Sequence, residues 1–113
     1  MDIGDRRPAL SLAEGLEIGS DLSIVIVNWN VRELLKRCLH SIISSLQLPT
    51  SNFQIEVIVV DNASSDDSVA MIEEEFPQVQ LIANSENVGF TVGNNQGITA
   101  SRGRYILLLN PDT

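Results

Sequence analysis

The sequence predicts an α/β fold with an open, mostly parallel sheet built from alternating β-α units. Short runs rich in valine and isoleucine alternate with segments of helical periodicity, and this alternation recurs four times along the 113 residues. The apolar runs are nearly continuous, which is typical of strands that are buried on both faces of a parallel sheet. Polar residues directly follow each run, and ligands bind beyond the carboxyl ends of the strands in such sheets.

The first predicted strand covers residues 22–27, and the helix after it has the clearest periodicity in the sequence. Asn30 is expected to be the N-cap of this helix, with Glu33 completing a capping box. His40 is expected to face solvent, and Pro49 ends the helix. The apolar stripe expected to face the sheet consists of Val31, Leu34, Leu35, Cys38, Leu39, Ile42, Ile43 and Leu46.

A second buried strand is predicted over residues 55–60 and stops at Asp61. Ser64 or Ser65 is expected to cap the helix that follows. The first turn of that helix holds two further acids, which the positive end of the helix dipole stabilises.

The second half of the chain repeats the pattern. A third strand is predicted over 79–83, followed by a segment rich in glycine and asparagine that leads into a helix, and then by a fourth strand over 105–109. Residues 1–20 have weak periodicity and are expected to form a flexible N-terminal extension with a short helix around residues 10–16. The organised domain is therefore expected to cover residues 21–113.

Composition excludes several classes of protein. Fifteen acidic residues against seven Lys and Arg give a net charge of −8, which argues against binding to nucleic acid. The single cysteine, Cys38, has no partner for an intrachain disulfide, which favours a reducing compartment. No apolar run approaches the roughly 20 residues that a transmembrane helix needs. The charged N-terminus does not resemble a signal peptide.

Common nucleotide-binding signatures are missing. The turn after the first strand reads Asn28-Trp29-Asn30 and lacks the glycines of a dinucleotide-binding fingerprint. The Gly-Lys-Ser/Thr of a phosphate loop and the paired acids of a receiver domain are absent as well. Gly89, Gly93 and Gly97 follow the third strand instead, and their four-residue spacing places them on one helix face that can approach the sheet closely.

The strand-end segments together resemble one family. These segments are SIVIVNWN at 23–30, EVIVVDNASSD at 56–66, NVGFTVGNNQG at 87–97 and GRYILLLNPDT at 103–113. In this order and spacing they resemble family 2 glycosyltransferases of the GT-A fold, most closely the rhamnosyltransferase-like branch. The resemblance implies a Rossmann-like domain of which residues 21–113 form the N-terminal, nucleotide-sugar-binding half, truncated at the metal motif.

The resemblance also implies a reaction. Enzymes of this family transfer a sugar, with inversion, from a nucleoside-diphosphate sugar to an acceptor hydroxyl. For this chain we expect a UDP- or dTDP-sugar as donor, a glycan or lipid-linked acceptor, and a role in cell-surface polysaccharide synthesis in the cytoplasm or at the inner face of the membrane. The reaction needs a general base. In the family this base lies in the second half of the domain, so no catalytic residue is assigned in this chain.

The resemblance assigns the nucleobase to the ends of the first two strands. The family's matching aspartate hydrogen-bonds the pyrimidine, which points to Asp61; its alternative role is to cap the turn before Ser64. Trp29 is expected to stack on the base, although large aromatic residues are more often part of a core. The other expected nucleotide-sugar-binding residues are Asn28, Asn30, Asn62, Asn87, Gly89, Phe90, Asn94 and Asn110. For Asn87 the alternative is that its amide satisfies a local turn.

The last three-residue motif, Asn110-Pro111-Asp112, matches the family's Asp-x-Asp metal motif with asparagine in place of the first acid. The second aspartate is the usual ligand, so Asp112 is expected to bind Mg²⁺ or Mn²⁺ together with the donor phosphates. The alternative is an ordinary turn aspartate after a proline.

Two other functions remain open from the sequence. One is a nucleotide-binding module without transfer activity. The other is an α/β fragment that self-associates through an open sheet edge and forms a homodimer.

Overall fold

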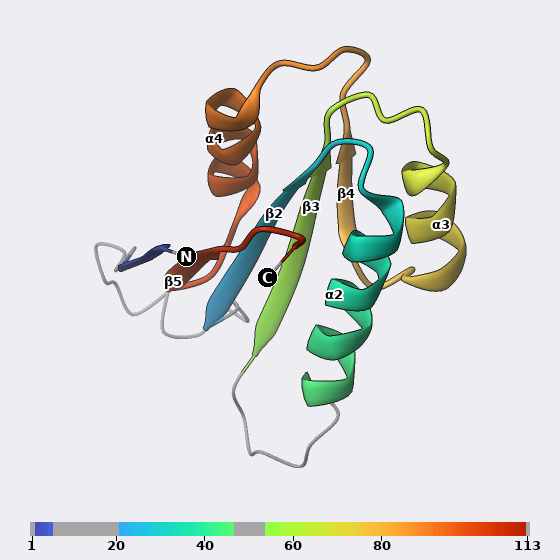
Figure 1. Cartoon of the computed structure of the whole chain (residues 1–113). Coiled ribbons are helices and arrows are strands. Elements are labelled where there is room, and N and C mark those ends of the chain that lie inside the picture. The colour runs from blue at the N-terminus through green and yellow to red at the C-terminus, as the bar shows by residue number, and fades with distance from the viewer. Residues whose placement is uncertain (1, 6–20, 47–53, 113) are drawn as a thin grey trace.

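The computed structural model describes residues 2–5, 21–46 and 54–112. Its sheet has the strand order β1-β5-β2-β3-β4 (Figure 1). Strands β2 to β5 run parallel, and β1 pairs antiparallel with β5. The elements are β1 (Asp2–Asp5), β2 (Leu22–Asn28), α2 (Arg32–Leu46), β3 (Ile55–Asp61), α3 (Ser68–Glu75), β4 (Gln80–Ala83), α4 (Phe90–Ala100) and β5 (Tyr105–Leu108). The predicted α/β class and its mostly parallel sheet are confirmed.

Strand β1 is the main departure from the expected fold. Residues Asp2–Asp5 form a strand rather than part of a flexible extension, so the expectation is wrong for these four residues. Their composition gives no strand signal, because aspartate and glycine are depleted in strands. The pairing arises from the exposed backbone groups along the edge of β5. Residues 6–20, which include the predicted short helix, lie outside the described residues.

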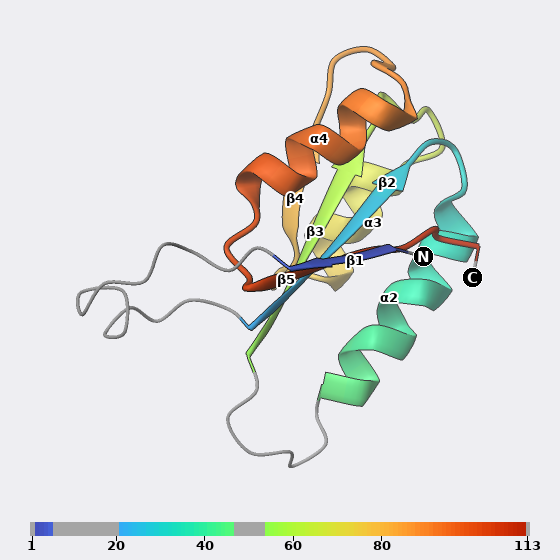
Figure 2. The same cartoon turned by 90° about the vertical axis from the view of Figure 1, so that its left-hand side faces the viewer.

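The helices cover the two faces of the sheet, with α2 and α3 on one side and α4 on the other (Figures 1 and 2). Ile24 and Ile26 of β2 belong to the core cluster that packs under α2 and α3. The alternate side chains of β2, Val25 and Val27, lie against α4. Both faces of β2 are therefore buried, as its unbroken apolar run predicts.

Glycines bring α4 close to the sheet, as their spacing predicts. A Cβ atom added to Gly97 would lie 2.3 Å from Val25 Cγ1, and one added to Gly93 would lie 3.1 Å from Val27 Cγ1. Any larger residue at position 97 would push the helix away from β2. This close approach places the first turn of α4 beside the carboxyl ends of β2 and β3.

The buried stripe of α2 is narrower than predicted. Leu35, Cys38 and Leu39 are buried against the sheet. Leu34 and Leu46, which the prediction also placed on the stripe, are exposed. His40 is exposed, as expected, and its ring also contacts the Phe76 ring of the α3 C-terminus edge-on, with 4.9 Å between centroids.

Both predicted helix caps are wrong: Asn30 does not cap α2, and neither Ser64 nor Ser65 caps α3. The side chain of Asn30 accepts a hydrogen bond from the Ser65 N–H, 2.8 Å away, and does not cap its own helix. Asp66 instead accepts from the first N–H of α2, at Arg32 (2.9 Å), and also from the N–H of Ser68 (3.1 Å), where α3 begins. One carboxylate thus accepts hydrogen bonds at the starts of both α2 and α3, because the fold brings these two helix ends together from distant parts of the sequence.

Candidate functional site

Polar residues gather where β2, β3 and β4 end, at the upper edge of the sheet in Figure 1. The loops after β2 and after β3 lie side by side there, and the loop after β4 leads into α4. We call the residues 28–32 and 61–66 of the first two loops the rim. The expected residues Asn28, Trp29, Asn30, Asp61 and Asn62 all belong to it.

Asp61 is fully buried at the centre of the rim. Its carboxylate accepts hydrogen bonds from Asn28 Nδ2 (2.8 Å), from the Ser64 N–H (2.9 Å) and from Ser64 Oγ (2.7 Å). The carboxylate therefore faces protein groups and has no open surface for a base. In this structure Asp61 has the turn-holding role that the sequence left as the alternative.

Asn28 ends β2 beside Asp61 and is also fully buried. Its Nδ2 group donates to Asp61, whereas its Oδ1 atom has no hydrogen-bond partner within the described residues. An unpaired buried acceptor costs about 1–3 kcal/mol. Buried polar atoms left unpaired are rare in native proteins, and a functional site is one place where they occur.

Two aromatic residues at this end of the molecule are exposed. Trp29 is 54% exposed and Phe90, the first residue of α4, is 59% exposed. Neither ring is part of the hydrophobic core, which removes the core alternative for Trp29. An exposed indole at a strand end offers a flat surface on which a base can stack.

A chain of carboxamides connects β3 to α4. Asn62 is buried; its Nδ2 donates to the Gly89 carbonyl (3.1 Å), and its Oδ1 accepts from Asn84 Nδ2 (2.9 Å). Asn84 and Gln96 then form a reciprocal amide pair with distances of 2.8 and 3.0 Å. Sequence reasoning missed Asn84 and Gln96. The signal for Asn84 was its position directly after a strand, whereas Gln96 becomes recognisable only once α4 packs beside β3.

The remaining expected residues are more scattered. Asn87 Oδ1 accepts from the Gly89 N–H (2.8 Å), which is the local turn that the sequence offered as its alternative role. Asn94 is buried on α4. Asn110 and Asp112 follow β5 and are exposed.

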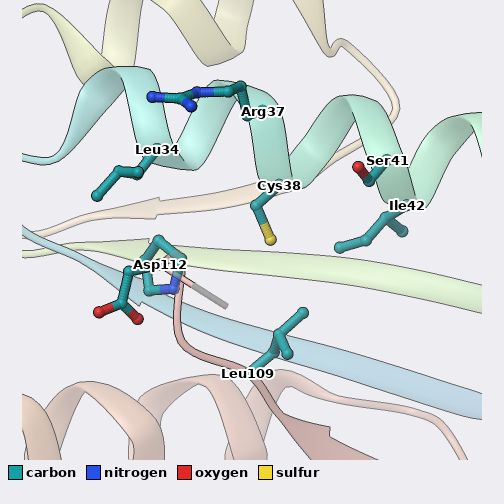
Figure 3. Close-up of a pocket in the computed structure, with 8 residues that line it drawn as sticks. Leu34, Arg37, Cys38, Ser41, Ile42, Leu109 and Asp112 are labelled. Carbon is teal, nitrogen blue, oxygen red and sulfur yellow. The ribbon is translucent and has the colours of Figure 1, made fainter.

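Asp112 lies in a separate groove between α2 and the segment after β5, with a volume of about 480 Å³ (Figure 3). Cys38 and Ile42 of α2 point into this groove, and Asp112 lies at its Leu34 end. No cluster of three or more His, Cys, Asp or Glu side chains suited to a metal occurs in residues 2–5, 21–46 and 54–112. A single carboxylate fits a magnesium- or manganese-like cation whose other ligands are water and substrate phosphates, as such ions are usually held.

Burial raises the pKa of the Cys38 thiol. The thiol is therefore neutral at ordinary pH and acts as a small apolar side chain. This agrees with its expected place on the buried stripe of α2.

The rim and the residue that directly follows it, Asp67, are held in a strained conformation. Asn30, Ala63 and Asp67 all have positive φ angles, of 52°, 61° and 66°. Such backbone costs of order 1 kcal/mol per non-glycine residue and persists only where surrounding contacts enforce it. Here the enforcing contacts include two hydrogen bonds between the loops, from the Ser65 N–H to Asn30 Oδ1 and from the Arg32 N–H to Asp66 Oδ2.

Asp66 is expected to contribute to stability in a pH-dependent way. Burial raises the pKa of Asp66, but hydrogen bonds from the Ser68 hydroxyl and from the N–H groups of Arg32 and Ser68 outweigh it, so the pKa lies below its ordinary value. The stabilisation is complete above the unfolded pKa of about 3.9 and is lost as the pH falls through the lower folded value.

In Asp66→Asn the free energy of unfolding, measured by urea denaturation at a series of pH values, should fall less steeply below about pH 4. Asp67→Asn removes the neighbouring acid, whose side chain makes no capping hydrogen bond, and should keep the wild-type slope. Equal slopes for wild type and Asp66→Asn would contradict this role of Asp66.

The sequence model of the family described as "Glycosyl transferase family 2" matches residues 23–113. The chain belongs to glycosyltransferase family 2. It is 33% identical over 93 residues to the succinoglycan biosynthesis protein ExoO of Rhizobium meliloti, covering 81% of this chain and 25% of that protein. It is 30% identical over 94 residues to the glycosyltransferase YibD of Escherichia coli, covering 80% of this chain and 26% of that protein. The chain thus spans about a quarter of the length of these relatives.

Solved structures support the fold. A mannosyltransferase from Pyrobaculum calidifontis, solved with GDP-Man and Mn²⁺, matches 81% of this chain and 27% of its own with a TM-score of 0.70 at 22% identity. Residues 1–349 of Staphylococcus aureus TarS, solved with UDP, match the same shares with a TM-score of 0.69 at 20% identity. The implied GT-A fold is therefore confirmed.

No helix in the described part of the chain has the length and apolar character that crossing a bilayer requires.

Proposed function

We propose that this family 2 chain is the donor-binding part of an inverting glycosyltransferase that uses a nucleoside-diphosphate sugar. The observation that carries the proposal is the exposed Trp29 on a rigid rim at the carboxyl edge of a parallel sheet, where ligands bind in open α/β sheets. The indole stacks on the base, and the buried Asn28 beside it helps to hold the rim through its hydrogen bond to Asp61. The neighbouring structures contain UDP or GDP-Man, and for this chain we propose a UDP- or dTDP-sugar.

The described residues have different roles in donor binding. Asp61 and Asn62 hold the rim and the start of α4 in place, and Asp112 supplies one carboxylate to a divalent cation. When bound, this cation neutralises the charge that develops on the diphosphate leaving group. The two acids of the rim, Asp61 and Asp66, accept hydrogen bonds that hold the rim together, so we assign neither of them as the general base. We therefore expect the 113-residue chain alone to bind the donor without transferring its sugar.

The names of two relatives support a proposal for the acceptor and the cellular setting. One relative takes part in succinoglycan biosynthesis, and another is described as a poly(ribitol-phosphate) beta-glucosyltransferase from Bacillus spizizenii, 30% identical over 95 residues. Both names refer to cell-surface polymers. We propose a glycan or lipid-linked acceptor for the longer protein, with synthesis in the cytoplasm at the inner face of the membrane.

Metal-dependent binding of the diphosphate tests this proposal. Mn²⁺ should tighten UDP or dTDP binding to the chain about tenfold or more, because Asp112 would hold the cation and the cation would neutralise charge on the phosphates. Uridine, which has no phosphates, should bind equally well with and without Mn²⁺. Isothermal titration calorimetry of the four combinations measures both effects.

In Asp112→Asn the carboxylate charge is lost while the shape is kept, so most of the gain from Mn²⁺ should disappear. Asp67→Asn removes an exposed acid at the start of α3, outside the groove that Asp112 lines, and serves as the matched control. Full metal enhancement in Asp112→Asn would show that Asp112 is not the ligand. Absence of UDP, dTDP and GDP binding to the wild-type chain would contradict the proposed function.

A further inference from the structure

Every hydrogen-bonding position of the Ser64 hydroxyl has a partner within the rim. Its Oγ atom accepts from the Asn30 N–H at 2.9 Å and from Asn28 Nδ2 at 3.3 Å, and it donates to Asp61 Oδ1 at 2.7 Å. A serine hydroxyl has one donor and two acceptor positions, so all three are in use. Ser64 belongs to the loop after β3, whereas Asn28 and Asn30 belong to the loop after β2.

Asn28 and Asn30 are the two chain neighbours of Trp29. The Trp29 side chain is half exposed, so packing covers only part of it. Its direction is therefore set by the backbone on either side, and Ser64 contacts the residue on each side. A further hydrogen bond, from the Asn62 N–H to the Asn28 carbonyl (2.9 Å), holds the same backbone at the strand end.

The backbone at Asn30 needs such support. Its φ angle of 52° lies in the left-handed region, which is disfavoured for a residue with a side chain. Without the Ser64 contact, the Asn30 N–H loses its acceptor and the loop has less reason to keep this conformation. The direction of the Trp29 ring would then vary.

We infer that Ser64 is a positioning residue that holds the Trp29 indole in its stacking orientation before a nucleobase binds. The inference rests on the proposed function for the identity of the ligand. A preformed platform avoids the cost of ordering a loop on binding. When only a fraction of molecules has the competent loop, the apparent Kd rises by the inverse of that fraction.

The adjacent Ser65 provides a matched control. Its backbone N–H, which no substitution by alanine removes, makes the close contact with Asn30 Oδ1 at 2.8 Å. Its hydroxyl lies 3.5 Å from the same oxygen, at the limit of a hydrogen bond. Ser65→Ala therefore changes the chemistry of the same loop while leaving the support of Trp29 intact.

Trp29 is the only tryptophan of the chain, so its fluorescence reports on the rim alone. In Ser64→Ala without ligand, the time-resolved anisotropy of Trp29 should decay faster and acrylamide should quench the ring more strongly. The Kd for UDP with Mn²⁺ should rise about tenfold, which corresponds to a competent fraction of about one tenth. Ser65→Ala should match the wild type in all three measurements.

A core variant separates local from global effects. Leu39→Ala weakens the core on the sheet face under α2 without contacting the rim, and its Trp29 anisotropy should stay at the wild-type value while circular dichroism shows a folded chain. Unchanged anisotropy and quenching in Ser64→Ala would overturn the inference even if UDP binds. If the wild-type chain binds no nucleotide, the proposed function fails instead, and the ligand-free anisotropy still decides whether Ser64 holds Trp29.

Discussion

Leu39→Ala is expected to lower the free energy of unfolding by about 2–5 kcal/mol, the range for truncating a buried leucine. Leu39 is fully buried at the centre of α2 and belongs to the same core cluster as Ile24, Ile26 and Met71. These neighbours come from the rigid sheet and from α3. They cannot collapse far into the space that the side chain leaves, so the cavity adds to the lost burial. Urea denaturation of the wild-type and variant chains measures the difference.

His40→Ala is the matched control for this prediction. His40 is the next residue of α2 and is exposed, but its ring packs against the edge of Phe76. An aromatic pair of this kind contributes about 0.5–1.5 kcal/mol, and exposure places His40 at the lower end. Equal losses for Leu39→Ala and His40→Ala would mean that the buried face of α2 is assigned incorrectly.

The sequence predicts the parallel sheet because its signals are local. An apolar run such as Ile24–Val27 buries all of its side chains when it forms a strand that is covered on both faces. The stripe through Leu35 and Leu39 is buried when its helix packs against that strand. Because strands of a parallel sheet end at a common edge, the positions of Trp29 and Asp61 in the fold follow as well. Edge strand β1 lacks such a signal, since its hydrogen bonds come from the exposed backbone of β5.

The details of the candidate site depend on contacts between distant residues. Asp66 caps α2, which lies 34 positions earlier in the chain, and no local pattern marks that partner. Asn84 and Gln96 pair only after α4 has packed on the sheet. The sequence thus indicates which edge carries the site, and the packing of three loops decides which side chains face a ligand and which hold the rim.

For Asp61, the family resemblance and the structure predict different experimental results. The family resemblance expects a direct hydrogen bond to the base, whereas the structure directs the carboxylate to Asn28 and Ser64. Direct contact predicts that Asp61→Asn weakens UDP binding while the free energy of unfolding stays unchanged. A turn-holding role predicts a loss of stability as the main effect.

We expect the loss of stability. Asp61→Ala removes the acceptor for the fully buried Asn28 amide and for the partly buried N–H and hydroxyl of Ser64. Leaving each buried donor unpaired costs about 1–3 kcal/mol, so the free energy of unfolding should fall by about 3 kcal/mol. Asp61→Asn keeps one acceptor oxygen and should lose less, because one amide oxygen can serve part of the set. Asp61→Ala also removes the hydrogen bonds that hold Ser64 in place. The fluorescence anisotropy of Trp29 should therefore fall in Asp61→Ala before any nucleotide is added. Wild-type stability and wild-type anisotropy in Asp61→Ala, together with a loss of UDP affinity, would instead establish the direct contact.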